Sequence, residues 1–237
     1  MRGVMGRLFT LSFVFFVSLV GPGAAETPKD PRILVIGDSL LASHSISGRS
    51  IGHYLEKMLR EPVERRPVAG ARMIYRLPIS GALGMSIPKQ FHAKKDWDWV
   101  VMNGGGNDLW LGCGCQKCDR KLDRLISKDG RRGEIPRLMA RILNSGSRVI
   151  YVGYLRSPGI QTPIEDCKDE GDELEARIAH FAERVKGVHY VSIRDLVPAG
   201  DLSYFTVDRI HPSLKASREI AARVARSLMR WRGMERS

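Results

Sequence analysis

The chain has 237 residues, of which 43% are hydrophobic and 27% are charged. That balance excludes an intrinsically disordered chain, and four cysteines are too few for a disulfide-dominated scaffold. A formal net charge of +12 favours anionic partners such as surface polymers or lipids. The charges are scattered and accompany no zinc-finger or helix-turn-helix signature, so we expect no nucleic-acid partner.

The N-terminus has the pattern of a secretory signal peptide. Arg2 and Arg7 precede or flank the start of an apolar run over residues 8–20, and small residues follow as far as Ala25. As a helix this run would span about 20 Å, against a hydrocarbon core of about 30 Å, although a retained signal anchor is the alternative. We therefore expect a signal peptide over 1–25 and an exported, periplasmic or secreted chain with no integral membrane span.

The remaining chain alternates strand and helix patterns. The apolar, β-favouring run at 33–36 predicts a buried strand of a parallel sheet. Further strands are predicted over 63–68, 97–102, 148–152 and 188–193, and helical stripes over 51–59, 135–143, 174–185 and 220–231. This alternation predicts right-handed crossovers and a three-layer α/β/α sandwich around a parallel sheet of about five strands. We expect one domain over 26–237.

The four cysteines lie in the part of the chain expected to be exported. Cys113, Cys115 and Cys118 cluster, and Cys167 stands alone. An even count in an oxidising compartment favours disulfides, and any pairing ties Cys167 to the cluster across roughly 50 residues. The sequence does not choose among the three pairings. A four-thiolate zinc site is the alternative, although the Cys-x-Cys-x-x-Cys spacing is irregular for a zinc knuckle.

Residues suited to acyl transfer follow the predicted strands. Ser39 follows the first strand, Asn107 follows the third, and Asp208 and His211 precede the last helix. Sites in doubly wound sheets lie beyond the carboxyl ends of the strands, so these segments are expected to converge. Serine needs a base, the pKa of histidine suits that role, and a carboxylate three residues earlier can orient the imidazole.

Donors for a developing oxyanion are also present. They are the backbone N–H groups of Ser39 and Gly70 and the side-chain amide of Asn107. Gly81 is the alternative to Gly70. Asp38, beside the serine, is interpreted as a turn residue that bonds nearby amides rather than as a second acid.

These segments resemble, in order and with plausible spacing, the sequence blocks of the SGNH (GDSL) hydrolases. Residues 37–40 read Gly-Asp-Ser-Leu, residues 105–108 read Gly-Gly-Asn-Asp, and Asp208-x-x-His211 matches the last block. The resemblance implies a flavodoxin-like sheet and esterase or lipase chemistry with no metal or cofactor. It also implies that a glycine and the asparagine complete the oxyanion hole with the serine amide.

The substrate is left open by these motifs. Small acyl esters, lysolipids, thioesters and O-acetylated envelope glycans all fit an exported serine esterase. The cysteine-bearing segment at 112–118 is not part of the general pattern, and we expect it to shape the pocket rim or restrict the substrate. Trp110 is close enough to Asp108 to line a pocket.

The alternative function is a binding module that holds an acylated glycan or lipid in the same cleft without turnover. Five histidines lie outside the blocks and match no catalytic pattern; they are His44, His53, His92, His180 and His189. Of these, His53 and His180 lie in predicted helices and are interpreted as surface or core residues.

Overall fold

The computed structural model describes residues 30–93, 96–157, 159–160 and 162–234, so the expected signal peptide lies outside the described residues. Within them, one parallel sheet has the strand order β2-β1-β3-β4-β5. Its strands are β1 (Ile33–Ile36), β2 (Val63–Arg65), β3 (Trp99–Met102), β4 (Arg148–Val152) and β5 (Val188–Val191). This order is that of a flavodoxin-like sheet, which confirms the predicted fold class.

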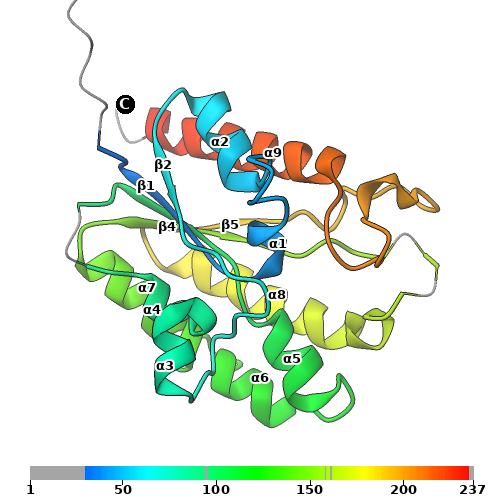
Figure 1. Ribbon diagram of the computed structural model, residues 1–237. Coiled ribbons are helices and arrows are strands. Elements are labelled where there is room, and N and C mark those ends of the chain that lie inside the picture. The colour runs from blue at the N-terminus through cyan, green and yellow to red at the C-terminus, as the bar shows by residue number, and fades with distance from the viewer. Residues whose placement is uncertain (1–29, 94–95, 158, 161, 235–237) are drawn as a thin grey trace, which may run out of the picture.

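Helices cover both faces of the sheet. They are α1 (Ser39–Ala42), α2 (Ile51–Leu59), α3 (Pro78–Ser80), α4 (Ile87–Gln90), α5 (Gly106–Cys113), α6 (Asp119–Leu125), α7 (Glu134–Asn144), α8 (Lys168–Arg184) and α9 (Leu214–Met234). A π-helical turn η1 (Gly81–Met85) and two 3-10 turns, η2 (Glu165–Cys167) and η3 (Leu202–Tyr204), lie between them. Figure 1 shows α2 and α9 on one face and α7 and α8 on the other. No helix in these ranges is long and apolar enough to cross a membrane.

Three strands are shorter than the sequence predicts, although the chain beyond β2 stays paired with β1. After Arg65 it remains beside β1, because Arg66 N donates to Val35 O at 2.9 Å and Val68 N to Gly37 O at 3.1 Å. Donors two residues apart point to the same neighbouring strand, so Pro67 between them faces the open edge of the sheet, where its missing N–H costs no bond to β1. The predicted segment therefore remains extended, although the regular strand ends at Arg65.

The core lies in two layers, one on each face of the sheet. Successive strand side chains point to opposite faces, so Leu34 and Ile36 belong to the cluster under α7 and α8. Ile33 and Val35 belong to the cluster under α2 and α9. Burial on both faces explains why β1 and β3 are continuous apolar runs rather than alternating ones.

The cysteines form two disulfides, Cys113–Cys118 and Cys115–Cys167. The first closes a short loop at the end of α5, and the second ties that loop to η2, 52 residues further along the chain. The expectation that Cys167 pairs with the cluster is confirmed. The zinc alternative is wrong, because a sulfur engaged in a disulfide is not a thiolate ligand.

The order of the strands also locates the crevice at which ligands bind in doubly wound sheets. The connections from β1 and β3 leave the sheet in opposite directions, which makes the carboxyl ends of these neighbouring strands the topological switch point. Ser39 lies three residues beyond the end of β1, and Asn107 is the second residue of α5, the helix that follows β3. The fold therefore brings together two segments that lie far apart in the sequence.

Candidate active site

Ser39 is the first residue of α1 and follows a tight turn out of β1. Gly37 in that turn has φ of +149°, and a Cβ built there would lie only 1.9 Å from Asn103 Oδ1. A side chain at position 37 would therefore displace Asn103. The glycine is required both by the backbone conformation and by this close approach.

Asp38 holds the turn from within the protein. Its carboxylate is 2% exposed and accepts hydrogen bonds from Leu40 N at 3.0 Å, Asn103 Nδ2 at 2.7 Å and Tyr154 Oη at 2.6 Å. Burial raises the pKa of Asp38, and the hydrogen bonds from Tyr154, Asn103 and Leu40 oppose that rise. The interpretation of Asp38 as a turn residue is confirmed by these contacts.

Two side chains missed by the sequence analysis fix the backbone of the same turn. Gln90 Oε1 accepts from Gly37 N at 2.7 Å, while Gln90 Nε2 donates to Gly37 O at 3.0 Å. Asn103 Oδ1 accepts from Asp38 N at 3.0 Å. Asn103 directly follows β3, so its position at a strand end was a usable signal. Gln90 lies in α4 and carried no such signal.

Tyr154 joins the two halves of the switch point. It lies two residues beyond β4, and its hydroxyl donates to Asp38 and accepts from Gly106 N at 3.1 Å. Burial raises the pKa of Tyr154 well above its usual range, and the charge of Asp38 acts in the same direction. The hydroxyl therefore stays protonated and connects the Ser39 turn to the first residue of α5.

His211 and Asp208 form a pair on the loop before α9. His211 Nδ1 lies 2.6 Å from Asp208 Oδ2, and Asp208 Oδ1 accepts from the backbone N–H groups of Ile210 at 2.9 Å and His211 at 3.0 Å. Burial acts to raise the pKa of Asp208, but these bonds and one from Thr206 hold it well below its usual range. Asp208 is thus an ionised acceptor that directs His211 Nε2 away from itself.

His44 anchors the His211 loop to the Ser39 segment. Its Nε2–H donates to the carbonyl oxygen of Pro212 at 2.9 Å, one residue after His211. Phe205 and Pro212 close the same loop through an antiparallel bridge. No local pattern in the sequence indicates this contact of His44.

The predicted oxyanion donors differ in what their N–H groups already bind. Gly81 N donates to Leu77 O at 3.0 Å, so the alternative glycine is already occupied. Asn107 Nδ2 donates to Ala71 O at 3.1 Å, which places Asn107 against the turn that contains Gly70. Within the described residues, the backbone N–H groups of Ser39 and Gly70 have no acceptor.

Asp108, next to Asn107, fixes the segment that follows Gly70. Its two carboxylate oxygens each accept one backbone N–H, from Met73 and from Ile74, both at 2.8 Å. Burial raises the pKa of Asp108 to about 6, although the bonds from Ile74 and Met73 oppose the rise. Asn107 and Asp108 together tie α5 to the Gly70 segment.

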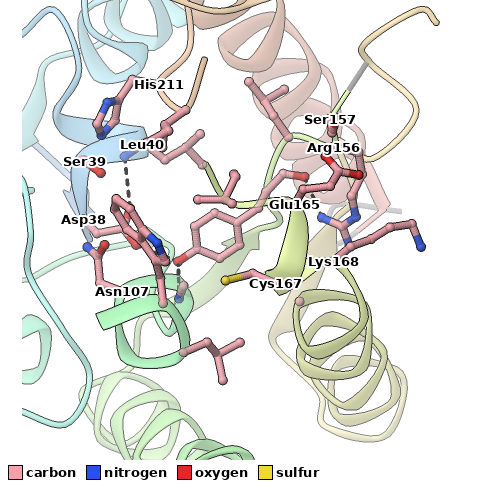
Figure 2. A pocket seen from close by; sticks show the side chains of 18 of the residues that line it. Asp38, Ser39, Leu40, Asn107, Arg156, Ser157, Glu165, Cys167, Lys168 and His211 are labelled. Atoms are coloured by element: carbon pink, nitrogen blue, oxygen red, sulfur yellow. Dashed lines mark hydrogen bonds between the residues drawn. The ribbon is translucent and has the colours of Figure 1, made fainter. Parts of the chain in front are cut away.

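A cavity of about 260 Å³ opens beside Ser39. Ser39, Asn107 and His211 line one end, and Trp110 also lines the cavity. Figure 2 shows Ser39, Asp38, Asn107 and His211 together on one side, with Cys167, Glu165 and Lys168 on the other. Gly70, Gly81 and Asp208 are not among the described residues that line it. Asp208 reaches the cavity only through the His211 ring.

Comparisons with known proteins give the family and the fold of the chain. Residues 35–218 match the model of the GDSL-like lipase/acylhydrolase family. No curated protein sequence matches the chain.

Solved structures share the fold at low identity. The aryl esterase of M. smegmatis has a TM-score of 0.64 and 16% identity over 84% of this chain and 99% of its own. A carbohydrate acetylesterase from Sinorhizobium meliloti has a TM-score of 0.62 and 14% identity over 85% and 100% of the two chains. A structure described as an SGNH hydrolase from Slackia heliotrinireducens has a TM-score of 0.60 and 20% identity over 84% and 100%.

Proposed function

The chain belongs to the GDSL-like lipase/acylhydrolase family and is an ester hydrolase, and we propose that Ser39 is its nucleophile and His211 its general base. Asp208 is the carboxylate that orients His211. The observation that carries this proposal is the 2.6 Å contact between Asp208 and His211 Nδ1, which leaves Nε2 free on a ring that lines the same cavity as Ser39.

The first half of the reaction acylates the enzyme. Ser39 Oγ attacks the ester carbonyl carbon while His211 Nε2 takes the hydroxyl proton, and the carbonyl electron pair moves onto oxygen. When the tetrahedral intermediate collapses, the bond to the alcohol oxygen breaks and His211 returns its proton to that oxygen. The ionised Asp208 stabilises the imidazolium that exists between these two proton transfers.

The oxyanion is stabilised by three N–H groups. They are the backbone N–H groups of Ser39 and Gly70 and the second side-chain N–H of Asn107, whose first N–H is bound to Ala71. Gly70 is preferred to Gly81 because the Gly81 N–H is already bonded to Leu77. Preorganised donors of this kind contribute a factor of about 10²–10³ each to kcat.

The second half of the reaction frees the enzyme. Water replaces the alcohol, gives its proton to His211 Nε2, and attacks the acyl carbon of the Ser39 ester. Collapse of the second intermediate releases the carboxylic acid, and the proton on His211 returns to Ser39 Oγ. No metal or cofactor takes part in this sequence of steps.

The protein acts outside the cytoplasm, in the periplasm or as a secreted enzyme, after removal of residues 1–25. The signal-peptide pattern and the two disulfides support this location, because disulfides persist in oxidising compartments. Its substrates there are acyl esters of small molecules, lipids or envelope glycans. The net charge of +12 favours anionic surface polymers or lipids around the substrate.

The test is hydrolysis of p-nitrophenyl esters by the mature chain and by Ser39→Ala. Loss of the nucleophile is expected to lower kcat at least about 10⁴-fold. Ser45→Ala is the matched control, because the Ser45 hydroxyl is exposed and donates only to Ala42 O. A fluorophosphonate probe should add one mass increment on Ser39. Equal turnover by Ser39→Ala, or ligand binding without turnover in both proteins, would contradict the proposal.

A further inference from the structure

The cavity beside Ser39 extends away from the reacting groups toward η2 and the start of α8. Ser39 and His211 line one end, and Cys167, Lys168 and Gly171 line it on the side of α8. In Figure 2, the labelled residues of these two groups lie on opposite sides of the cavity, with other side chains between them. A group bonded to the reacting carbonyl therefore has room to extend toward α8.

The walls between these two ends are mainly apolar. The apolar and aromatic side chains that contribute are Leu40, Leu109, Trp110, Tyr154, Leu155, Ile164 and Leu174. Binding of methylene groups to such a surface is favourable, because it removes them from water, and the surface provides few hydrogen-bond partners for hydroxyl groups.

Several polar side chains on the walls are already engaged. Ser157 Oγ donates to Ile160 O at 2.9 Å, and Lys168 Nζ donates to Asp172 at 3.2 Å. The Tyr154 hydroxyl is bonded to Asp38 and Gly106. The Arg156 guanidinium pairs with Glu175 at 2.7 Å and with Asp172 at 2.6 Å. A sugar in this cavity would lose hydration without gaining these groups as partners, so the chemistry of the walls favours a hydrocarbon chain.

The volume limits the length of that chain. A methylene group occupies about the volume of a water molecule, roughly 30 Å³, so about 260 Å³ has room for about eight or nine carbon-sized groups. An acetyl group would leave most of the cavity unfilled. A long-chain acyl group would have to leave it or displace its wall.

The Cys115–Cys167 disulfide fixes that wall. Cys167 lines the cavity, while Cys115 is 5% exposed and packs in the core cluster with α6 and α7 residues. The bond therefore anchors η2 and the first turn of α8 to the end of α5. Cys113 and Cys118 are not among the described residues that line the cavity, so the Cys113–Cys118 disulfide provides an internal control.

We infer that this cavity binds an unbranched acyl chain of up to about nine carbons, with the Cys115–Cys167 disulfide setting the far limit of its length. The inference rests on the proposed function, because it assumes that Ser39 accepts the acyl group. It assigns a substrate class to that site, namely medium-chain acyl esters rather than acetyl esters of glycans.

The first experiment measures kcat/KM for p-nitrophenyl esters from acetyl to palmitoyl. Each buried methylene is worth about fourfold, so kcat/KM should rise at least tenfold from acetyl to a chain of about eight carbons and fall for longer chains. If hydrolysis depends on Ser39 but is equal at every chain length, or is fastest for acetyl esters, the inference is wrong and the proposed function stands. If no ester is hydrolysed by the wild type, the proposed function itself fails.

Filling the cavity tests its role directly. Gly171 lies in α8 and lines the cavity, and a Cβ built there meets no atom within 4 Å. Gly171→Leu should lower the ratio of octanoyl to acetyl kcat/KM at least tenfold. Gly233→Leu is the matched control, because Gly233 is an exposed helical glycine in α9 with equally open space. An unchanged ratio in Gly171→Leu would overturn the inference.

Removing the wall disulfide tests the limit on length. In the double variant Cys115→Ser with Cys167→Ser, the optimum should shift to longer chains or broaden by at least two carbons. Cys113→Ser with Cys118→Ser should keep the wild-type optimum. Circular dichroism tests whether both double variants are folded. If the Cys115→Ser, Cys167→Ser variant is not folded, the Gly171→Leu result alone decides. Identical profiles in two folded doubles would show that the disulfide does not set the length.

Discussion

The two halves of the active site are held by different kinds of structure. The Ser39 turn is fixed by buried side chains from distant segments, with Asn103 0% exposed and bonded to both the backbone and the side chain of Asp38. His211 is held by its own loop, through an aspartate three residues earlier that is about two-fifths exposed. The Ser39 half therefore depends on tertiary structure and the His211 half on a local turn.

This difference separates stability from catalysis. Removing one member of a buried polar network lowers the free energy of unfolding, because the remaining groups lose a hydrogen-bond partner that water cannot replace. An exposed turn loses little when a side chain is removed, since water replaces the missing partner. Substitutions in the Ser39 half should therefore change the free energy of unfolding, whereas those in the His211 half should change mainly kcat.

The largest expected effect is that of His211→Ala. Without its general base the enzyme should lose about 10³- to 10⁴-fold in kcat, while the free energy of unfolding changes by less than about 1 kcal/mol. Ester hydrolysis and urea unfolding measure the two quantities on the same preparation. A decrease of more than about 2 kcal/mol in the free energy of unfolding would show that the His211 half is not a local, exposed turn.

Asn103→Ala should have the next largest effect, and on stability. It removes the acceptor of Asp38 N and a donor to the Asp38 carboxylate in a fully buried position, so we expect a loss of about 2–4 kcal/mol in urea unfolding. Asn144→Ala is the matched control, because Asn144 is exposed at the end of α7. Equal stability of the two variants would contradict the role assigned to the buried network.

Asp108 and Asp208 should make stability depend on pH in opposite directions. Burial raises the pKa of Asp108 to about 6, above about 3.9 in the unfolded chain. Between these two pH values, Asp108 keeps a proton in the folded protein that it has lost in the unfolded chain. The free energy of unfolding therefore decreases as pH rises through this range, by up to about 2–3 kcal/mol above pH 6. The pKa of Asp208 is lowered instead, so its contribution is present above about pH 4 and is lost only as pH falls.

The measurement is urea unfolding of the wild type and Asp108→Asn from pH 4 to pH 7. The stability of the wild type relative to the variant should decrease across this range, because only the wild type pays the cost of ionising Asp108. Asp119→Asn, an exposed substitution in α6, should give a difference that does not change in this way. A relative stability that rises with pH would reverse the sign and contradict the role of burial.

The smallest effect is expected at the contact that joins the halves. His44→Ala removes the hydrogen bond to Pro212 O and should lower kcat about two- to tenfold, with KM nearly unchanged, because one net hydrogen bond is involved. His44→Gln retains an N–H donor and should restore part of kcat, which a purely steric role would not predict.

His53→Ala is the control for that prediction. His53 is bonded to Ser50 near the start of α2 and has no hydrogen bond to the His211 loop. Its kcat should therefore remain within about twofold of the wild type. If His44→Ala behaves in the same way, the two halves are aligned without the His44 contact.

Local patterns were sufficient to predict the principal elements and the motif residues. The apolar runs of β1 and β3 indicated strands buried on both faces, and the spacing of Asp208 and His211 is short enough for the pair to form within one turn. Strand boundaries were less well predicted, because the chain beyond β2 stays hydrogen-bonded to β1 although the regular strand ends at Arg65. The supporting residues Gln90 and His44 were missed, since each acts on a segment far away in the chain.

The sequence by itself determined the α/β class, the order of the elements and the catalytic motifs, because periodicity, turn chemistry and motif spacing are local properties of the chain. The tertiary structure decided which cysteines pair, which glycine keeps a free N–H beside Asn107, and how far the cavity extends from Ser39. These depend on distances between segments that only the packed sheet and its helices establish. The acyl-chain length that we infer for the cavity belongs to this second group, because the walls come from α1, α5, α8 and the loop after β4.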